Sequence, residues 1–124
     1  MKSHQDTLFV KKKRRFNFRE YQIVAARTAV YPEIGHSVVY PALGLANEAG
    51  EVLGKIKKIF RDKGGVFEDA DKKVISKELG DVLWYISQVA NELGIDLEDV
   101  AEQNIHKLLD RKERGVIQGS GDER

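Results

Sequence analysis

Apolar side chains recur every three or four positions along most of this chain, which is the spacing of one helix face and not of a β-strand. In the segment 72–93 the stripe consists of Ile75, Leu79, Val82, Ile86, Val89 and Leu93. In the segment 41–60 it consists of Leu45, Ala49, Val52, Ile56 and Ile59. Since no stretch shows the period-two alternation of a strand, the pattern predicts an all-α fold.

Glycine and proline residues divide the pattern into four helices, predicted over residues 18–30, 41–60, 72–93 and 97–114. Asp96 is expected to cap the last of these, and its inward face is expected to contain Val100, Ala101, Ile105, Leu108 and Leu109. Four helices joined by short loops predict a core that resembles a four-helix bundle.

With 124 residues the chain has enough apolar surface for one domain, predicted over residues 17–115. Residues 1–16 form an arm that contains the basic block Lys11–Arg15, and residues 116–124 form a Gly-rich tail. The block has no interleaved aromatic residues, so nucleic acid is not an expected partner. Four short helices leave apolar faces to cover, and we therefore expect a homodimer or a homotetramer.

Cysteine is absent from the sequence, which excludes a disulfide framework, a thiolate metal site and a thiol nucleophile. No apolar run has the roughly 18 residues that a membrane helix needs, and no segment resembles a signal peptide. These features predict a cytoplasmic protein that does not enter the membrane.

Acidic residues accompany the apolar stripes of the two central helices, each one position before a stripe residue: Glu48, Glu51, Glu78 and Asp81. Because the loop between the two helices is short, they are expected to pack antiparallel with their stripes facing, so both acid rows emerge on the same side of the pair. Four neighbouring carboxylates repel one another unless cations neutralise them, and an all-oxygen site suits Mg²⁺, or alternatively Mn²⁺. Such pairs also occur on solvated helix faces, so surface charge is the alternative reading.

The segments GLANEAGEV and KELGDVLWYI, which contain these acids, resemble the MazG-like nucleotide pyrophosphohydrolases of the all-α superfamily. The resemblance also covers FREYQIVAARTAVYP and the closing segment from Lys107 onward. It implies a nucleoside triphosphate as substrate, with nucleoside monophosphate and pyrophosphate as products. It assigns Glu48, Glu51, Glu78 and Asp81 to Mg²⁺, and Glu51 is the residue expected to accept the proton of the attacking water.

Further residues are assigned partly from this resemblance. Asn104, Lys107 and Arg111 form one polar stripe on the last helix, and the resemblance suggests that Lys107 and Arg111 contact phosphate. The family pattern has Asn-x-Lys there, whereas Asn104 and Lys107 are three positions apart. Lys55 and Lys58 are expected to contact phosphate or to pair with nearby acids.

Nucleoside contacts are expected from Tyr85, Asn104 and His36, the last of which lies with Tyr40 just before the second helix. A structural role for Tyr85 and an ordinary loop position for His36 are the alternatives. Two other functions fit the same pattern of residues: a non-catalytic helical interaction module, and an enzyme like phosphoribosyl-ATP pyrophosphohydrolase.

Overall fold

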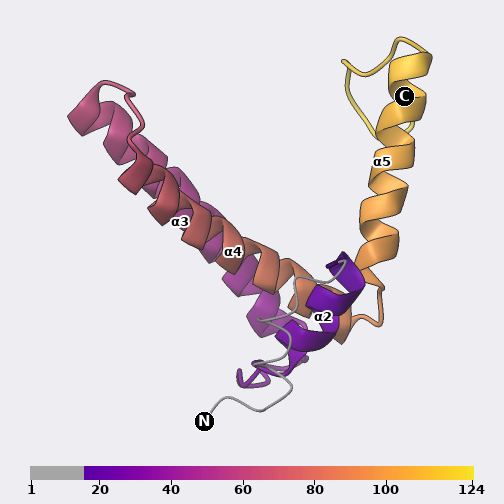
Figure 1. Cartoon of the computed structure of the whole chain (residues 1–124). Coiled ribbons are helices and arrows are strands. Elements are labelled where there is room, and N and C mark those ends of the chain that lie inside the picture. The colour runs from indigo at the N-terminus through magenta and orange to yellow at the C-terminus, as the bar shows by residue number, and fades with distance from the viewer. Residues whose placement is uncertain (1–15) are drawn as a thin grey trace.

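A computed structural model of the protein describes residues 16–124, and the regular secondary structure in this part of the chain is helical (Figure 1). The helices are α2 (Phe18–Ala26), α3 (Val39–Lys63), α4 (Asp69–Glu92) and α5 (Leu97–Glu113). The predicted all-α fold with four helices is thereby confirmed. The basic arm predicted over residues 1–16 lies outside the described residues, apart from Phe16.

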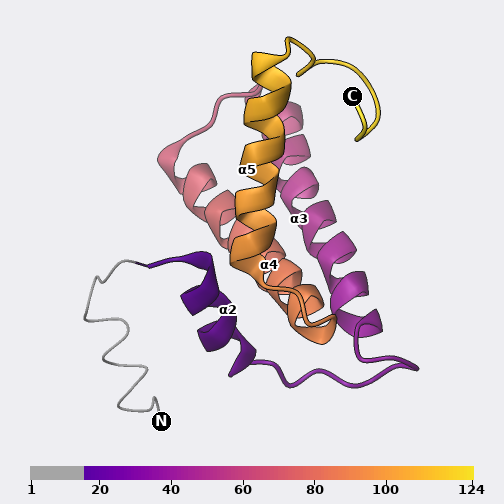
Figure 2. The same ribbon diagram turned by 90° about the vertical axis from the view of Figure 1, so that its right-hand side faces the viewer.

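Helices α3 and α4 form a long antiparallel hairpin, which is the largest packed unit of the described chain (Figures 1 and 2). The turn between them uses Gly64 and Gly65 with φ of 59° and 81°, a left-handed conformation that glycine adopts without strain. A capping box formed by Glu68 and Asp71 then starts α4. The antiparallel pairing expected from the short loop is therefore present.

Helix α2 starts at an N-cap formed by Asn17, whose side chain accepts a hydrogen bond of 2.8 Å from the Glu20 amide. It ends at Ala26, so the prediction that it continues to Val30 was wrong. After Ala26 the amides of residues 27–29 bond the carbonyls three positions back, which is a tightened last turn. Pro32 also biases the preceding residue, Tyr31, away from helical backbone angles, which disfavours continuation of the helix up to this point.

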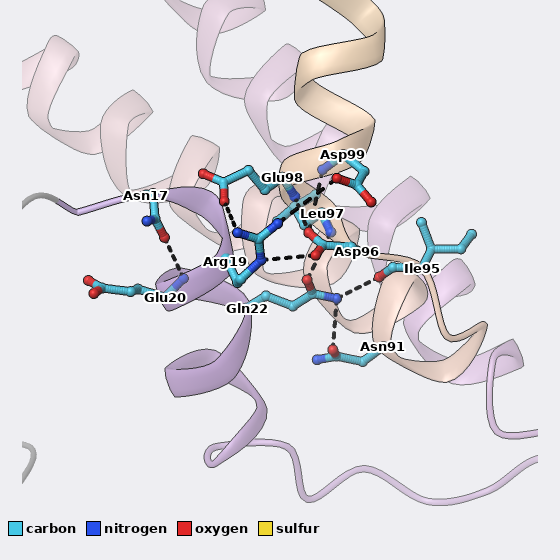
Figure 3. Close-up of polar contacts among 10 residues, drawn as sticks. All are labelled: Asn17, Arg19, Glu20, Gln22, Asn91, Ile95, Asp96, Leu97, Glu98 and Asp99. Carbon is cyan, nitrogen blue, oxygen red and sulfur yellow. Dashed lines mark hydrogen bonds and ion pairs between the residues drawn. The ribbon is translucent and has the colours of Figure 1, made fainter.

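Gln22 attaches α2 to the junction between α4 and α5 (Figure 3). Its amide nitrogen donates to Asn91 Oδ1 at 2.9 Å and to the Ile95 carbonyl at 2.8 Å. Its amide oxygen accepts from the Leu97 amide at 2.8 Å. Because Gln22 and Leu97 are buried, these bonds satisfy polar groups that water does not reach.

A second, exposed contact reinforces the same junction (Figure 3). The guanidinium of Arg19 lies 3.0 Å from Asp96 Oδ2 and 2.8 Å from Glu98 Oε2. Asp96 also caps α5, as predicted, by accepting from the amides of Glu98 and Asp99. The first turn of α5 is therefore fixed both by its cap and by a side chain from α2.

Helix α5 packs against α2 and then diverges from the α3–α4 hairpin (Figure 1). The prediction that its apolar stripe faces inward within the chain was wrong, because four of its five residues are exposed: Val100, Ile105, Leu108 and Leu109. On α4, three residues of the predicted stripe are also exposed: Leu79, Ile86 and Leu93. The physical reason is that no other helix of the described chain covers these faces.

No helix among residues 16–124 combines the length and the apolar composition needed to cross a bilayer.

Candidate metal centre

Three of the four predicted carboxylates converge where α3 and α4 face each other. Glu48 from α3 and Glu78 and Asp81 from α4 each offer one oxygen, and these oxygens all lie within 4.8 Å of one another. We call these three residues the acid triangle. Because Glu78 and Asp81 are three positions apart, they share one face of α4, and the antiparallel pairing brings that face to Glu48.

The electrostatics of the acid triangle are those of a cation site. Burial raises the pKa of the Glu48 carboxyl above its usual range, and the neighbouring acids raise it further, in the order Asp81, Glu78 and Glu51. Lys55 Nζ lies 3.9 Å from Glu78 Oε1 at the edge of the triangle. Among residues 16–124, the acid triangle therefore carries more negative charge than the neighbouring Lys55 balances.

Glu51, the fourth predicted carboxylate, is exposed and lies outside the acid triangle. It is close enough for its charge to contribute to the raised pKa of Glu48. Its position one turn along α3 from Glu48 leaves its oxygens next to the triangle but not part of it.

The ligand set of the acid triangle fits a hard divalent cation. It consists of carboxylate oxygens alone, without histidine or cysteine, which is the donor chemistry that Mg²⁺ and Mn²⁺ prefer. A triangle of three carboxylates leaves coordination positions for water or phosphate oxygens, as Mg²⁺ sites usually do. The residues present therefore suit the metal expected from the sequence.

An aromatic cluster of Tyr31, Tyr40, Trp84 and Tyr85 adjoins the acid triangle. Tyr31 stacks on Tyr40 with ring centroids 5.5 Å apart, and Trp84 meets Tyr85 edge to face at 5.0 Å. Tyr31 also meets Trp84 edge to face at 6.1 Å. These contacts join α4, the start of α3 and the segment before it into one aromatic surface.

Tyr85 connects this aromatic cluster to the acid triangle. Burial raises the pKa of its hydroxyl, and Tyr40, Glu48 and Asp81 raise it further. Of the cluster, the sequence indicated Tyr85 and the neighbourhood of Tyr40, whereas Tyr31 and Trp84 were not assigned to a site. The available signal for Tyr31 was an aromatic residue directly before Pro32.

His36 lies at the outer edge of the same region. Its Nδ1 accepts a hydrogen bond of 3.1 Å from the Val38 amide.

Glu92 links His36 to the aromatic cluster. The Tyr31 hydroxyl donates a hydrogen bond to Glu92. Burial, followed by this hydrogen bond, raises the pKa of Tyr31 to about 12. The pKa of Glu92 is lowered by hydrogen bonds from Tyr31 and Ser37 and then by the charge of His36. His36 is therefore beside the aromatic cluster, on the side of Glu92.

Gly44 allows the Tyr85 ring to lie directly against α3. A Cβ atom at position 44 would be 2.2 Å from Tyr85 Cε1, far inside van der Waals contact. Glycine is therefore needed here for close approach of the two helices and not for an unusual backbone angle.

We expect Gly44→Ala to lower the free energy of unfolding by about 1–3 kcal/mol, because the added methyl group forces the Tyr85 ring or α3 to move. Urea unfolding followed by circular dichroism measures this. Gly54→Ala is the matched control, since a Cβ there meets nothing within 4 Å and alanine favours helix over glycine by about 0.5–1 kcal/mol. Equal stabilisation by both substitutions would contradict the close contact.

Of the two predicted phosphate contacts on α3, Lys55 borders the acid triangle. Lys55 and Lys58 line a cavity of about 170 Å³ between α3 and α4. The other residues of its wall are Ile59, Asp62, Lys63, Asp71, Val74 and Ile75. Lys63 is engaged by Asp71 at 2.9 Å, whereas Lys55 reaches towards Glu78. Lys55 therefore joins this cavity to the acid triangle.

The predicted contacts on α5 lie elsewhere in a single chain. Asn104, Lys107 and Arg111 belong to the helix that diverges from the hairpin (Figure 1). Lys107 and Arg111 contact Asp122 of the C-terminal segment, at 3.5 and 3.4 Å. Within the described chain these three residues are thus not gathered with the acid triangle.

A family model described as the MazG nucleotide pyrophosphohydrolase domain matches residues 41–116, a range that includes the acid triangle. The Gene 37 protein of Mycobacterium phage L5 is 49% identical over 109 residues, which cover 84% of this chain and 96% of that protein. No solved structure gives a significant match.

Proposed function

Because the chain belongs to the MazG nucleotide pyrophosphohydrolase family, we propose that it hydrolyses nucleoside triphosphates to nucleoside monophosphates and pyrophosphate, with Mg²⁺ held at the acid triangle. The family resemblance seen in the sequence is confirmed by the match. The observation that carries the proposal is the convergence of Glu48, Glu78 and Asp81 within 4.8 Å. A role in controlling the (deoxy)nucleotide pool follows from this chemistry.

Glu48, Glu78 and Asp81 are the residues that would hold Mg²⁺, with Mn²⁺ as a substitute. The bound ion supplies charge neutralisation of phosphate oxygens and a lowered pKa for a coordinated water. In the reaction, a water oxygen forms a bond to the α- or the β-phosphorus. The bond between that phosphorus and the oxygen bridging the α- and β-phosphates breaks, which releases the monophosphate and pyrophosphate. Glu51 lies beside the triangle, so it is available to accept the proton that the attacking water loses.

Lys55 and Lys58 are assigned to the phosphate chain. Lys55 already approaches Glu78, so a phosphate oxygen placed beside the triangle is within the range of its ammonium group. Phosphoryl transfer depends mostly on positioning and charge neutralisation, and it needs no serine, cysteine or histidine nucleophile. The lysine-lined cavity next to the triangle meets that requirement.

The aromatic cluster is assigned to the nucleoside. Tyr85 adjoins Glu48 and Asp81, so a base stacked on this surface would leave its phosphates near the acid triangle. His36 is assigned to the same subsite from its position beside Glu92. Asn104 is assigned to the nucleoside as well, from α5 of a second copy of the chain.

The proposed function is tested by incubating the purified protein with a panel of ribonucleoside and deoxyribonucleoside triphosphates and Mg²⁺. We expect pyrophosphate and the matching monophosphate to appear in equal amounts from at least one nucleotide. Release of single phosphates, or no product from any nucleotide, would contradict the proposal.

Mg²⁺ alone is expected to stabilise the protein. At a concentration of 100 times its Kd, an ion that binds only the native state adds about 2.7 kcal/mol, which raises the Tm by several degrees. Glu48→Gln should lose this shift. An equal Tm with Mg²⁺ and with EDTA would instead favour a non-catalytic helical module whose acids are surface charge.

We also propose that the protein forms a homodimer or a homotetramer. The exposed apolar faces of α4 and α5 recur at helical spacing, and Leu79, Leu93, Ile105 and Leu109 are each more than half exposed. Contiguous apolar stripes of this kind mark protein interfaces. A second copy is the natural occupant, because it presents the same long apolar faces in return.

Sedimentation at micromolar concentration is expected to give a dimer or a tetramer for the wild-type protein. Leu109→Glu should shift the protein towards monomer, because it places a charge in the buried interface. Lys112→Glu introduces the same side chain at an exposed polar position of α5, so it should leave the assembly unchanged. A monomeric wild-type protein would overturn this proposal.

A further inference from the structure

The C-terminal segment 116–124 folds back beside the end of α5 (Figures 1 and 2). Its Asp122 side chain contacts two cations of that helix. Asp122 Oδ1 lies 3.4 Å from Arg111 Nη2 and 3.5 Å from Lys107 Nζ. The backbone carbonyl of Asp122 accepts a further hydrogen bond of 2.6 Å from Arg111 Nη2. One residue of this segment therefore contacts both side chains that are assigned to phosphate on α5.

Hydrogen bonds at the start and at the end of the segment 116–124 hold it against α5. The Val116 amide bonds the Arg111 carbonyl at 2.9 Å, which starts the return of the chain. Gly119 and Gly121 have φ of 136° and 82°, so the reversal depends on conformations that other residues rarely adopt. Arg114 then donates to the Arg124 backbone oxygen at 2.9 Å. Backbone and side-chain oxygens of the segment thus occupy a row of cations on α5.

Arg111 has the character of a built anion site. It is 4% exposed, and a buried guanidinium needs a negative partner. Yet both of its hydrogen bonds to Asp122 come from Nη2, whereas an arginine usually holds a carboxylate or a phosphate with two nitrogens. Asp122 fills this site with less than the full contact that the arginine offers.

The partner carboxylate is held weakly. The side chain of Asp122 is 84% exposed, so solvent screens its ion pairs with Lys107 and Arg111. Pyrophosphate carries more charge and more oxygens than one carboxylate, and it is able to reach the Lys107 ammonium and both ends of the guanidinium at once.

We propose that Lys107 and Arg111 form a phosphate-oxyanion site that the chain closes with its own Asp122, and that pyrophosphate or a nucleotide phosphate chain opens it by displacing the segment 116–124. The proposal rests on the proposed function, which supplies a ligand with a phosphate chain, and on the expectation from the sequence that Lys107 and Arg111 contact phosphate. It adds an internal competitor for that phosphate, located in the C-terminal segment. Hydrogen bonding to Arg111, followed by the charge of Lys107, lowers the pKa of Asp122, so the competitor is ionised at neutral pH.

The test is calorimetric titration of the full-length protein with inorganic pyrophosphate in EDTA, where no hydrolysis takes place. We expect Asp122→Asn to bind pyrophosphate about five-fold more tightly than wild type, the value of an exposed ion pair of about 1 kcal/mol. Glu123→Gln removes a neighbouring carboxylate that has no ion pair among the described residues, so it should bind as wild type does. Equal affinity of all three proteins both for pyrophosphate and for a nucleoside triphosphate, or no binding of either ligand, would overturn the proposal.

A second titration with a nucleoside triphosphate in EDTA distinguishes the two sources of phosphate. If both ligands gain affinity in Asp122→Asn, free pyrophosphate competes with the segment; if only the triphosphate gains, the substrate's phosphate chain is the occupant. Both results support the site. Because no turnover is measured, failure of this proposal appears as unchanged affinity, whereas failure of the proposed function appears as absence of pyrophosphate release with Mg²⁺.

Amide hydrogen exchange tests the displacement directly. If Asp122 had only a structural role, pyrophosphate would not change the exchange rates of residues 116–124. Saturating pyrophosphate in EDTA should accelerate exchange in wild-type residues 116–124, because their anchor is displaced. In Asp122→Asn the segment should exchange fast with or without the ligand. Slower exchange in the wild type on binding would show that the anion strengthens the closed segment, which would overturn displacement.

Discussion

Glu48→Gln and Asp81→Asn are each expected to lower Mg²⁺-dependent pyrophosphate release by at least about 10³-fold. The reason is that metal-ion catalysis contributes several kcal/mol to the reaction, and each 1.4 kcal/mol of barrier is worth about a factor of ten. Both substitutions keep the size of the side chain but remove one anionic ligand from the acid triangle. The measurement is initial rate at saturating nucleotide over a range of Mg²⁺ concentrations.

The same substitution in Glu48 should not harm the metal-free fold. The pKa of Glu48 is raised in the native protein, so ionising this side chain costs more free energy in the folded state than in the unfolded state. The free energy of unfolding therefore decreases as the pH rises through that pKa. In EDTA at neutral pH, the Tm of Glu48→Gln should therefore equal or exceed that of wild type. The matched control for activity is Glu102→Gln, an exposed acid on α5. Full activity of the Glu48 variant, or equal loss in the control, would exclude the proposed role.

Gln22→Leu is expected to reduce the free energy of unfolding by about 3 kcal/mol. The substitution removes three hydrogen bonds and leaves the buried Leu97 amide without a partner, at a cost of about 1–3 kcal/mol. Loss of the bonds to Asn91 and Ile95 adds about 0.5–1.5 kcal/mol each. The added apolar surface recovers part of that loss. Urea unfolding at one fixed protein concentration gives the value, because assembly makes stability depend on concentration.

Gln103→Leu is the control for this prediction. Gln103 is exposed on α5, and surface substitutions usually change stability by less than about 0.5 kcal/mol. If both glutamine variants unfold at the same urea concentration, the attachment of α2 to the α4–α5 junction is not a source of stability.

Local patterns in the sequence predicted the parts of the molecule that depend on helix geometry. The acid pairs at Glu48 and Glu78 required only a period of 3.6 residues and an antiparallel neighbour. Asp96 was recognised as a cap because it precedes an apolar stripe and its side chain is short. These features are encoded within a few residues of one another.

Contacts between distant segments were not predictable in this way. The bonds of Gln22 join positions about seventy residues apart, and nothing next to Gln22 in the sequence marks it as buried. The exposure of Ile105 and Leu109 follows from the divergence of α5, which depends on how the α4–α5 turn is oriented and not on the stripe itself. Asp122 was missed for the same reason, because its partners on α5 become neighbours only when the Gly-rich segment reverses.

The close contact between Gly44 and Tyr85 has a further consequence for the metal. Gly44 precedes Glu48 by one helical turn, and Tyr85 follows Asp81 by one turn, so in an antiparallel pair this contact is adjacent to the ligands on both helices. The thickness of an aromatic ring therefore sets how far apart the two backbones run where the carboxylates meet. Mg²⁺ holds its oxygens at 2.0–2.1 Å and Ca²⁺ at 2.3–2.6 Å. If the proposed site holds a metal, its preference between ions of different radius is expected to depend on helix spacing, which two uncharged residues govern.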